Sequence, residues 1–251
     1  MRRACLLATL ACCRFEHGTP GSLTGDGGTD ATGDGPGDVA RDATRPPYCD
    51  PADDTLIACY AFESSTQDAS PNALHATMTN VTFAAGRVGM AAQLGATSAM
   101  DVADSALFDS PALTIEAWIH PTQLPGAGAR FGILDNNGQY GMFLHEQGRL
   151  HCAMVNGHSM MVDAAIAAST WTHVACTYSG STTTIYVDGV QLFQASGGTA
   201  LATGGTTGIS IGADNPPGAG ARFLGLIDQV RLSSVARTRE VICADAPLAC
   251  P

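Results

Sequence analysis

The sequence of 251 residues contains no lysine, and all twelve of its basic residues are arginine. Charged residues make up only 14% of the chain and aromatic residues only 6%, and the formal net charge is −11. A nucleic-acid-binding protein needs clustered basic residues that displace phosphate counterions, so this composition excludes that class. No apolar run approaches the roughly 20 residues that span a bilayer, which excludes a multi-pass membrane protein. Abundant alanine, glycine and threonine instead favour β structure built from small residues.

The amino terminus has the layout of an export signal. A positive start at residues 1–3 precedes an apolar run over residues 4–13. Residues 10–13 (LACC) resemble the lipobox of bacterial lipoproteins, which makes Cys12 and Cys13 the candidate lipidation sites. An ordinary secretory signal and a mis-assigned start codon are the alternatives. We expect a chain that is exported to the bacterial cell envelope and anchored there through lipid, or secreted.

Residues 14–47 contain few large apolar side chains and are rich in Gly, Thr, Asp and Pro. Aspartates recur every four residues, at positions 26, 30, 34, 38 and 42. Such a segment buries too little apolar surface to offset chain entropy, so it is predicted to be a disordered linker. A period of four matches neither the EF-hand loop nor the nine-residue β-roll repeat of calcium-binding proteins. The expected organisation is a signal segment (1–13), a linker (14–47) and one folded domain (48–251).

From Tyr48 onward, short alternating segments are separated by Gly, Asn, Asp and Pro. The expected strands are residues 56–62, 113–120, 131–134, 141–145, 149–155, 171–178, 182–187 and 224–232. Asp188-Gly189 is a strong signal for a two-residue hairpin, because both turn positions favour positive φ. Residues 135–138 and 146–148 indicate further turns, and only residues 233–244 are expected to form a helix. This pattern predicts an all-β fold, a two-sheet antiparallel sandwich or jelly roll.

The expected domain contains an even set of cysteines. They are Cys49, Cys59, Cys152, Cys176, Cys243 and Cys250. Behind an export signal, such a set predicts disulfides. Proximity favours the pairs Cys49–Cys59, Cys152–Cys176 and Cys243–Cys250. A rival pattern joins the two ends of the domain, Cys49 or Cys59 to Cys243 or Cys250. No Cys-x-x-Cys or His-x-x-x-His spacing supports a zinc site.

Five blocks of sequence occur in an order typical of one family. They are residues 60–63 (YAFE), 68–75 (DASPNALH), 113–119 (LTIEAWI), 171–189 (WTHVACTY to IYVDG) and 225–231 (GLIDQVR). Together they resemble the LamG-like jelly-roll family of the concanavalin A-like lectin/glucanase superfamily, across residues 58–242. Pro71 and Ala76 stand where the family usually has glycine. The resemblance implies a concanavalin A-like sandwich, and a fold alone does not supply a function.

Signals for catalysis are missing from the folded part. Glucanases of this superfamily use carboxylates at E-x-D-x-x-E spacing, and none of the four glutamates of the domain has that spacing. The pair His145-Glu146 opens like a metalloprotease motif, but Arg149 stands where the second histidine belongs. There is no Gly-x-Ser-x-Gly elbow. We therefore expect no enzymatic activity, and a glycoside hydrolase is the less favoured alternative.

Sugar-binding proteins combine aromatic rings with polar side chains, and one face of two expected strands offers both. By alternation, Glu116, Trp118 and His120 share a face of their strand, and His173 on strand 171–178 is expected to line the same open face. Tyr140, beside a hairpin, completes the candidate ligand-binding set. Packing in the core is the alternative for the tryptophan.

Two other groups of polar residues are interpreted as structural. His145, His151 and His158 lie near hairpins and are expected to be solvated loop residues rather than metal ligands. Asp214-Asn215, which precedes two prolines, is interpreted as a turn.

A structural calcium ion is the one cofactor that the resemblance implies. Many members of the superfamily carry calcium at an edge of the sandwich, and calcium prefers oxygen ligands. Asp68, Asn72 and Asp228 are the candidate ligands, since first and last strands commonly pair in this family. As alternatives, Asp68 and Asn72 are ordinary turn residues and Asp228 pairs with an arginine.

The sequence thus predicts an exported, surface-anchored, non-catalytic binding module that recognises carbohydrate or an extracellular protein. A purely structural or adhesive surface domain stabilised by calcium is the alternative.

Overall fold

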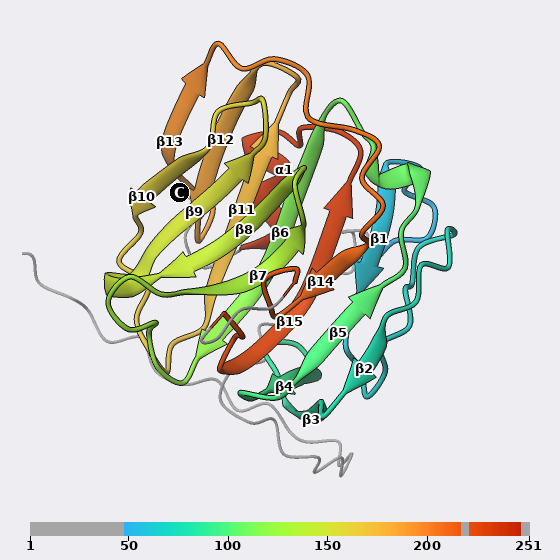
Figure 1. The fold of residues 1–251 in the computed structure, drawn as a ribbon. Coiled ribbons are helices and arrows are strands. Elements are labelled where there is room, and N and C mark those ends of the chain that lie inside the picture. Colours follow the sequence, from blue (N-terminus) through green and yellow to red (C-terminus); the bar gives the residue numbers. More distant parts are fainter. Residues whose placement is uncertain (1–47, 217–220, 247–251) are drawn as a thin grey trace, which may run out of the picture. The chain divides into compact units, whose positions relative to one another are not determined.

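The computed structural model describes residues 48–216 and 221–246, whose fifteen strands form two antiparallel sheets (Figure 1). The proposed signal segment with Cys12 and Cys13, the linker and Cys250 lie outside these residues. The two-sheet antiparallel fold expected from the sequence is confirmed. Among the described residues, no helix is long and apolar enough to cross a membrane.

The first sheet has eight strands. In order across the sheet they are β13 (Val190–Ser196), β12 (Thr182–Val187), β11 (Thr172–Tyr178), β6 (Leu113–Pro121), β15 (Gly225–Ser233), β4 (Met90–Leu94) and β3 (Thr82–Ala85), with β1 (Leu56–Tyr60) also paired to β15. First and last strands therefore pair, as the family resemblance implies: Cys59 lies opposite Arg231.

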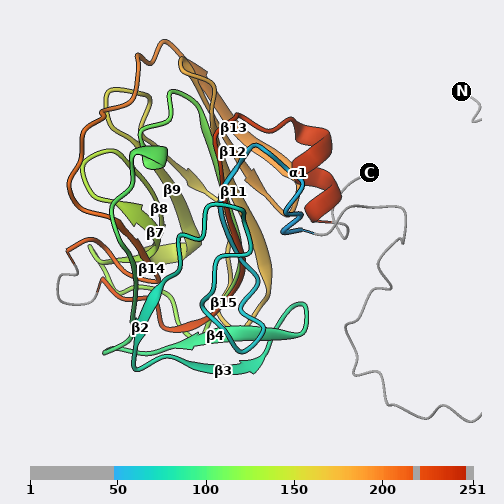
Figure 2. The same cartoon turned by 90° about the vertical axis from the view of Figure 1, so that its right-hand side faces the viewer.

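The second sheet has seven strands and lies face to face with the first. In order they are β10 (Met160–Asp163), β9 (Arg149–Met154), β8 (Tyr140–His145), β7 (Arg130–Asn136), β14 (Ile209–Ile211), β5 (Ala99–Val102) and β2 (Thr77–Thr79). Figure 2 shows the two layers from the side, with the short helix α1 (Arg239–Asp245) against the outer side of the eight-stranded sheet.

Strand alternation decides which side chains fill the space between the sheets. On β6, Leu113, Ile115 and Ile119 are completely buried in the core cluster. Met142 of β8 and Ile211 of β14 enter the same cluster from the opposite sheet. The residues that alternate with these core residues along each strand therefore point outward from the sheets. Any site must be built from those outward-facing residues or from the loops.

The hairpin prediction is confirmed and the helix prediction is partly wrong. Asp188 and Gly189, with φ of 48° and 76°, turn β12 into β13. The expected helix over residues 233–244 begins too early, because Ser233 still belongs to β15 and Thr238 is extended. Between β8 and β9 the expected turn is a short 3-10 segment, η2 (Glu146–Gly148); a second, η1 (Ala106–Phe108), follows β5.

Two disulfides reinforce the sandwich, and both join neighbouring cysteines as proximity favours. Cys152 of β9 is bonded to Cys176 of β11, which links the two sheets. Cys49 is bonded to Cys59 and so ties the segment before β1 to that strand. Cys243 in α1 is disulfide-bonded as well.

Candidate functional site

The predicted ligand residues of β6 and β11 come together on the outer side of the eight-stranded sheet. Trp118 lies opposite His173, and the centroids of their rings are 5.2 Å apart. This face is not open, however, because Glu116 and His173 have no exposed surface and Trp118 is only 5% exposed. His120, at the end of β6, is half-buried with its ring 5.2 Å from that of Trp171.

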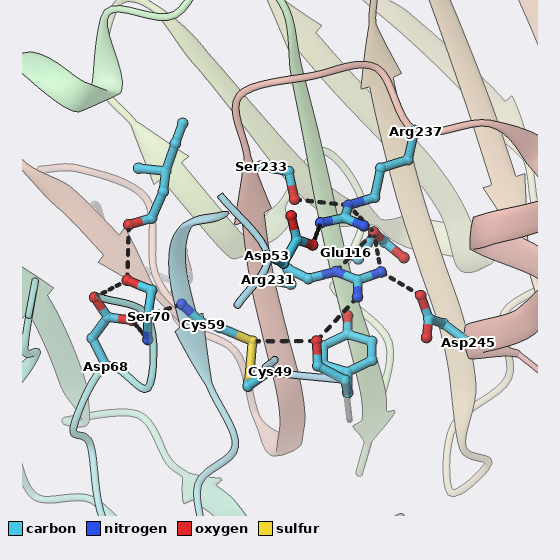
Figure 3. The surroundings of a disulfide bond; sticks show 12 residues. Cys49, Asp53, Cys59, Asp68, Ser70, Glu116, Arg231, Ser233, Arg237 and Asp245 are labelled. Carbon is cyan, nitrogen blue, oxygen red and sulfur yellow. Dashed lines mark hydrogen bonds and ion pairs between the residues drawn. A yellow bond between two sulfur atoms is a disulfide. The ribbon is translucent and has the colours of Figure 1, made fainter. Parts of the chain in front are cut away.

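A buried ion-pair network covers the carboxylate of Glu116 (Figure 3). Its Oε1 accepts a 2.7 Å hydrogen bond from Nη2 of Arg231, and Nη1 of Arg231 donates to the carbonyl oxygen of Tyr48 at 3.1 Å. Arg231 also pairs with Asp245 of α1. Next to the network, Ile242 of α1 clusters with two buried residues of the sheet. The cluster joins α1 and the amino-terminal end of the domain to the sheet, and leaves Glu116 no surface for a ligand.

The candidate calcium ligands make protein contacts in two different places. Asp68 accepts hydrogen bonds from the backbone N–H groups of Cys59, Ser70 and Leu74, so its carboxylate closes the loop that follows β1. Asn72 donates from Nδ2 to the carbonyl oxygens of Leu56 and Ile57, in β1.

Asp228 instead accepts from the backbone N–H groups of Arg87 and Val88, before β4. Burial raises the pKa of Asp228 to about 7 despite these hydrogen bonds. Within the described part of the chain, no group of three or more His, Cys, Asp or Glu side chains is arranged to hold a metal ion. Calcium binding stays a prediction.

The outer side of the seven-stranded sheet has a cleft of about 330 Å³. It is lined by Arg130, Asp135, Asn136, Asn137, Gly138, Tyr140, Phe143, Ala153, Val155, Asp214, Asn215 and Pro216. These residues come from β7, β8 and β9 and from the loop that follows β14. The volume falls at the lower end of the range of about 300–1,000 Å³ typical of small-molecule sites.

Two small residues lie on the outer side of β8 and β9 beside this cleft, and the Phe143 ring packs over one of them, Gly141. Asp135, Gly141 and Ala153 lie side by side across β7, β8 and β9. A Cβ atom on Gly141 would lie 2.6 Å from the ring of Phe143 and 3.0 Å from Oδ1 of Asp135, closer than a real side chain permits. Glycine is therefore required here for Phe143 and Asp135 to approach each other.

An arginine stacked on an aromatic ring forms one wall of the cleft. The Arg130 guanidinium lies 4.1 Å above the centroid of the Phe143 ring, a cation–π contact. Its Nε donates to both carboxylate oxygens of Asp214, at 3.0 and 3.2 Å. The Arg130 side chain is 39% exposed, so one face of this arrangement is open to solvent. A positive, planar donor is thus held rigidly at the edge of the cleft.

The second carboxylate of the cleft, that of Asp135, binds its proton more tightly than an ordinary aspartate does. Oδ2 of Asp135 accepts a 2.7 Å hydrogen bond from the backbone N–H of Asn215. Burial, with a contribution from the negative charge of Asp214, raises the pKa of Asp135 to about 6 even though this hydrogen bond and Arg130 oppose the shift. Asp135 therefore changes its charge close to physiological pH.

Of the five residues expected to bind a ligand, only Tyr140 lines the cleft. The other four lie on the opposite sheet. Sequence reasoning missed Arg130 and Asp135, and it interpreted Asp214 and Asn215 as a turn. One signal was present in the chain: the segment from Asp135 to Gly138 concentrates amide and carboxylate side chains at the end of β7 and in the turn that follows it.

A histidine pair lies on the same outer side of this sheet. Nε2 of His145 and Nδ1 of His151 are 3.3 Å apart, and Nε2 of His151 is 2.8 Å from Oγ of Ser159. The ring of His151 also lies 5.7 Å from that of Phe143, which lines the cleft. The interpretation of these histidines as solvated loop residues is wrong for His151, which lies within β9 and is hydrogen-bonded on both ring nitrogens.

Solved structures of extracellular and toxin proteins share this fold. Domain 4 of AbnA, an extracellular arabinanase from Geobacillus stearothermophilus solved with arabinotriose, matches with a TM-score of 0.63 and 23% identity, covering 76% of this chain and 98% of that one. The binding domain of Paraclostridial Mosquitocidal Protein 1 matches with a TM-score of 0.63 and 19% identity, covering 76% and 51%.

The binding domain of Botulinum neurotoxin DC, solved with rat synaptotagmin II, matches with a TM-score of 0.57 and 11% identity, covering 78% and 52%. The chain thus spans about half the length of the two toxin domains. At these identities the likeness concerns the fold alone.

Sequence comparison places the chain within one superfamily. No curated protein matches it. A laminin G family model, described as the concanavalin A-like lectin/glucanases superfamily, matches residues 94–243. The match begins after the two earliest sequence blocks at residues 60–63 and 68–75, and it includes β6, β11 and β15. The chain belongs to the concanavalin A-like lectin/glucanases superfamily.

Proposed function

We propose that the domain is a non-catalytic glycan-binding module whose ligand occupies the cleft on the seven-stranded sheet. The observation that carries the proposal is the cleft lined by Asn137 and Ala153 beside the guanidinium of Arg130, which is held by Phe143 and Asp214. A concave site with a few fixed polar groups is typical of small-molecule recognition.

The groups around the cleft suit a polyhydroxylated ligand. Asn137 is exposed at the turn between β7 and β8, and its amide offers both a donor and an acceptor to sugar hydroxyls. Val155 is 40% exposed and, with Pro216, offers apolar surface to the C–H faces of a sugar ring. One arginine faces two carboxylates, so above the pKa of about 6 of Asp135 these three groups carry a net charge of about −1, which disfavours acidic sugars and suits a neutral glycan.

The way in which the two carboxylates are held supports binding without cleavage. Glycosidases need one carboxylic acid and one carboxylate positioned on either side of the scissile bond. Here Asp214 is held by Arg130, and Asp135 is only 7% exposed with Oδ2 bonded to the backbone of Asn215. Neither is presented to a substrate in the manner that acid–base catalysis requires. Structural neighbours solved with a bound sugar support the binding role.

We place this module outside the cell, attached through the amino-terminal segment. The lipobox-like residues 10–13 and the linker 14–47 support a lipid anchor followed by a tether. The two disulfides Cys49–Cys59 and Cys152–Cys176 fit an oxidising compartment.

A glycan array with the full-length chain tests the proposal, followed by calorimetry with the glycan that binds best. We expect Asn137→Ala and Arg130→Ala each to weaken binding about tenfold or more, which corresponds to about 1.4 kcal/mol. Gln194→Ala, an exposed residue on the edge strand β13, is the matched control and should bind like the parent chain.

Two results would overturn the proposal. The first is the absence of any glycan response, which would favour a protein partner. The second is equal loss of binding in the control variant. Appearance of new reducing ends when the selected glycan is incubated with the protein would contradict the non-catalytic part.

A further inference from the structure

The histidine pair beside the cleft has no role in the proposed glycan site. His145 ends β8 and His151 lies in β9, so the two imidazoles project diagonally from neighbouring strands on the outer side of the sheet. Both residues are half-buried, which leaves the pair accessible to small ions. Their nearest ring nitrogens are 3.3 Å apart.

This separation is the one that a chelated metal ion requires. Zinc–nitrogen bonds of about 2.0–2.1 Å at a tetrahedral angle place two nitrogen ligands roughly 3.3–3.4 Å apart. A bound ion can therefore replace the hydrogen bond between the rings without moving either strand. We propose that His145 and His151 are a two-histidine chelating site for a divalent transition-metal ion that prefers imidazole, of the class Zn²⁺, Ni²⁺ or Cu²⁺.

A neighbouring hydroxyl prepares His151 as a ligand. Oγ of Ser159 lies 2.8 Å from Nε2 of His151. In the tautomer that binds a metal through Nδ1, Nε2 carries the proton and donates a hydrogen bond to this hydroxyl oxygen. Histidines that bind metals are usually held by such a second hydrogen bond, which fixes the tautomer and the ring orientation.

Charged groups of both signs lie around the pair. The carboxylates of Glu146 and Asp214 and the guanidinium groups of Arg130 and Arg149 surround His145, and Arg130 also acts on His151. Oε2 of Glu146, the residue after His145, is buried without a hydrogen-bond partner among the described residues.

Two protein ligands leave the remaining coordination positions to water or to an oxygen of another molecule. Among the residues that the structure describes, no third His, Cys, Asp or Glu side chain completes the set. The site is therefore open, as metal sites that accept an exogenous ligand are. The Phe143 ring separates it from the cleft, so this inference stands or falls independently of the glycan proposal.

Copper titration of the full-length chain tests the site, after free thiols are blocked with N-ethylmaleimide so that cysteines do not bind the metal. Copper binds nitrogen ligands more tightly than zinc or nickel. We expect the parent chain to bind one more copper ion per molecule than the double variant His145→Gln/His151→Gln. Each single histidine substitution should lower the affinity for this copper ion at least about tenfold. Ser159→Ala should lower it about tenfold, because the second hydrogen bond of His151 is lost.

His158→Gln is the matched control, because His158 lies in the same region and its side chain takes no part in the pair. It should bind copper like the parent chain. Circular dichroism checks the folding of each variant, and His145→Gln alone suffices if His151→Gln does not fold. The proposal is overturned if the double variant keeps the full stoichiometry, or if the control loses the same equivalent.

Nitrogen NMR of the histidine side chains gives a second, site-specific readout with Zn²⁺. Added zinc should shift Nε2 of His145 and Nδ1 of His151 while leaving His158 unchanged. Shifts confined to other histidines, or no shifts at millimolar zinc, would overturn the assignment.

Discussion

Nη2 of Arg231 lies 2.7 Å from Oε1 of Glu116, and the two side chains are only 5% and 0% exposed. Removal of one partner from a buried ion pair costs up to about 3–5 kcal/mol, and without Glu116 the buried guanidinium of Arg231 keeps Asp245 as its one carboxylate partner in this network. We therefore predict that Glu116→Ala lowers the free energy of unfolding by about that amount, as measured by urea denaturation. Glycan binding by the folded fraction should be unchanged, because Glu116 does not reach the cleft.

Glu240→Ala is the control for this prediction, since Glu240 is an exposed acidic residue of α1. A free energy of unfolding for Glu116→Ala within about 0.5 kcal/mol of the parent value would contradict the structural role of the pair. Loss of glycan binding by a fully folded Glu116→Ala would restore its role as a ligand residue.

The raised pKa of Asp135 predicts a pH-dependent stability difference. The folded state holds this proton up to about pH 6, so the contribution of the group to stability is complete below its ordinary pKa and is lost as the pH rises through 6. Asp135→Asn should match the parent chain near pH 4 and exceed its unfolding free energy by about 2 kcal/mol near pH 7.5. Urea denaturation at both pH values measures this, and a difference that does not vary with pH would refute the assignment.

The disulfide between Cys152 and Cys176 should contribute strongly to stability, because it joins β9 of one sheet to β11 of the other. Its sequence separation is 24 residues, for which the loop-entropy relation gives about 3.5 kcal/mol. We predict that Cys152→Ala/Cys176→Ala unfolds at a markedly lower urea concentration. The corresponding double variant of Cys49 and Cys59, with a separation of 10, should lose less. Equal losses of unfolding free energy in the two double variants would contradict a dependence on loop length.

The imidazole of His151 should remain neutral well below its ordinary titration range. Burial and the neighbouring His145 and Arg130 charges lower its pKa to about 4. NMR titration should therefore show His151 titrating near pH 4 in the folded protein and near 6.5 in urea. Because the folded pKa is depressed, the group reduces stability progressively as the pH falls from about 6.5 towards 4. Titration of His151 near 6.5 in the folded state would contradict the buried pair.

The sequence predicts the fold well because its signals are local. Asp188-Gly189 requires positive φ, and strands such as β6 and β11 alternate clearly between large apolar and polar residues. Six short strands escape prediction, because three to five residues are too few to show a readable alternation: β2, β3, β4, β5, β10 and β14. Their pairing is decided by the sheets that they join.

The candidate site was harder to predict because its residues meet only through tertiary structure. Alternation correctly groups Glu116, Trp118 and His173, but it cannot show that α1 and the Tyr48 segment cover part of that face. Likewise, Arg130 and Asp214 are 84 residues apart and form their pair only once β7 and the loop after β14 are adjacent. Burial and long-range pairing, rather than residue type, decide which outer face remains open.

Amide NMR with the glycan selected on the array tests the central claim most directly, because it reports where the ligand lies. We predict chemical-shift changes at Asn137, Gly138 and Asn215, around the cleft on the seven-stranded sheet. Changes concentrated instead at Trp118, His120 and His173 would place the ligand on the opposite sheet and contradict the account.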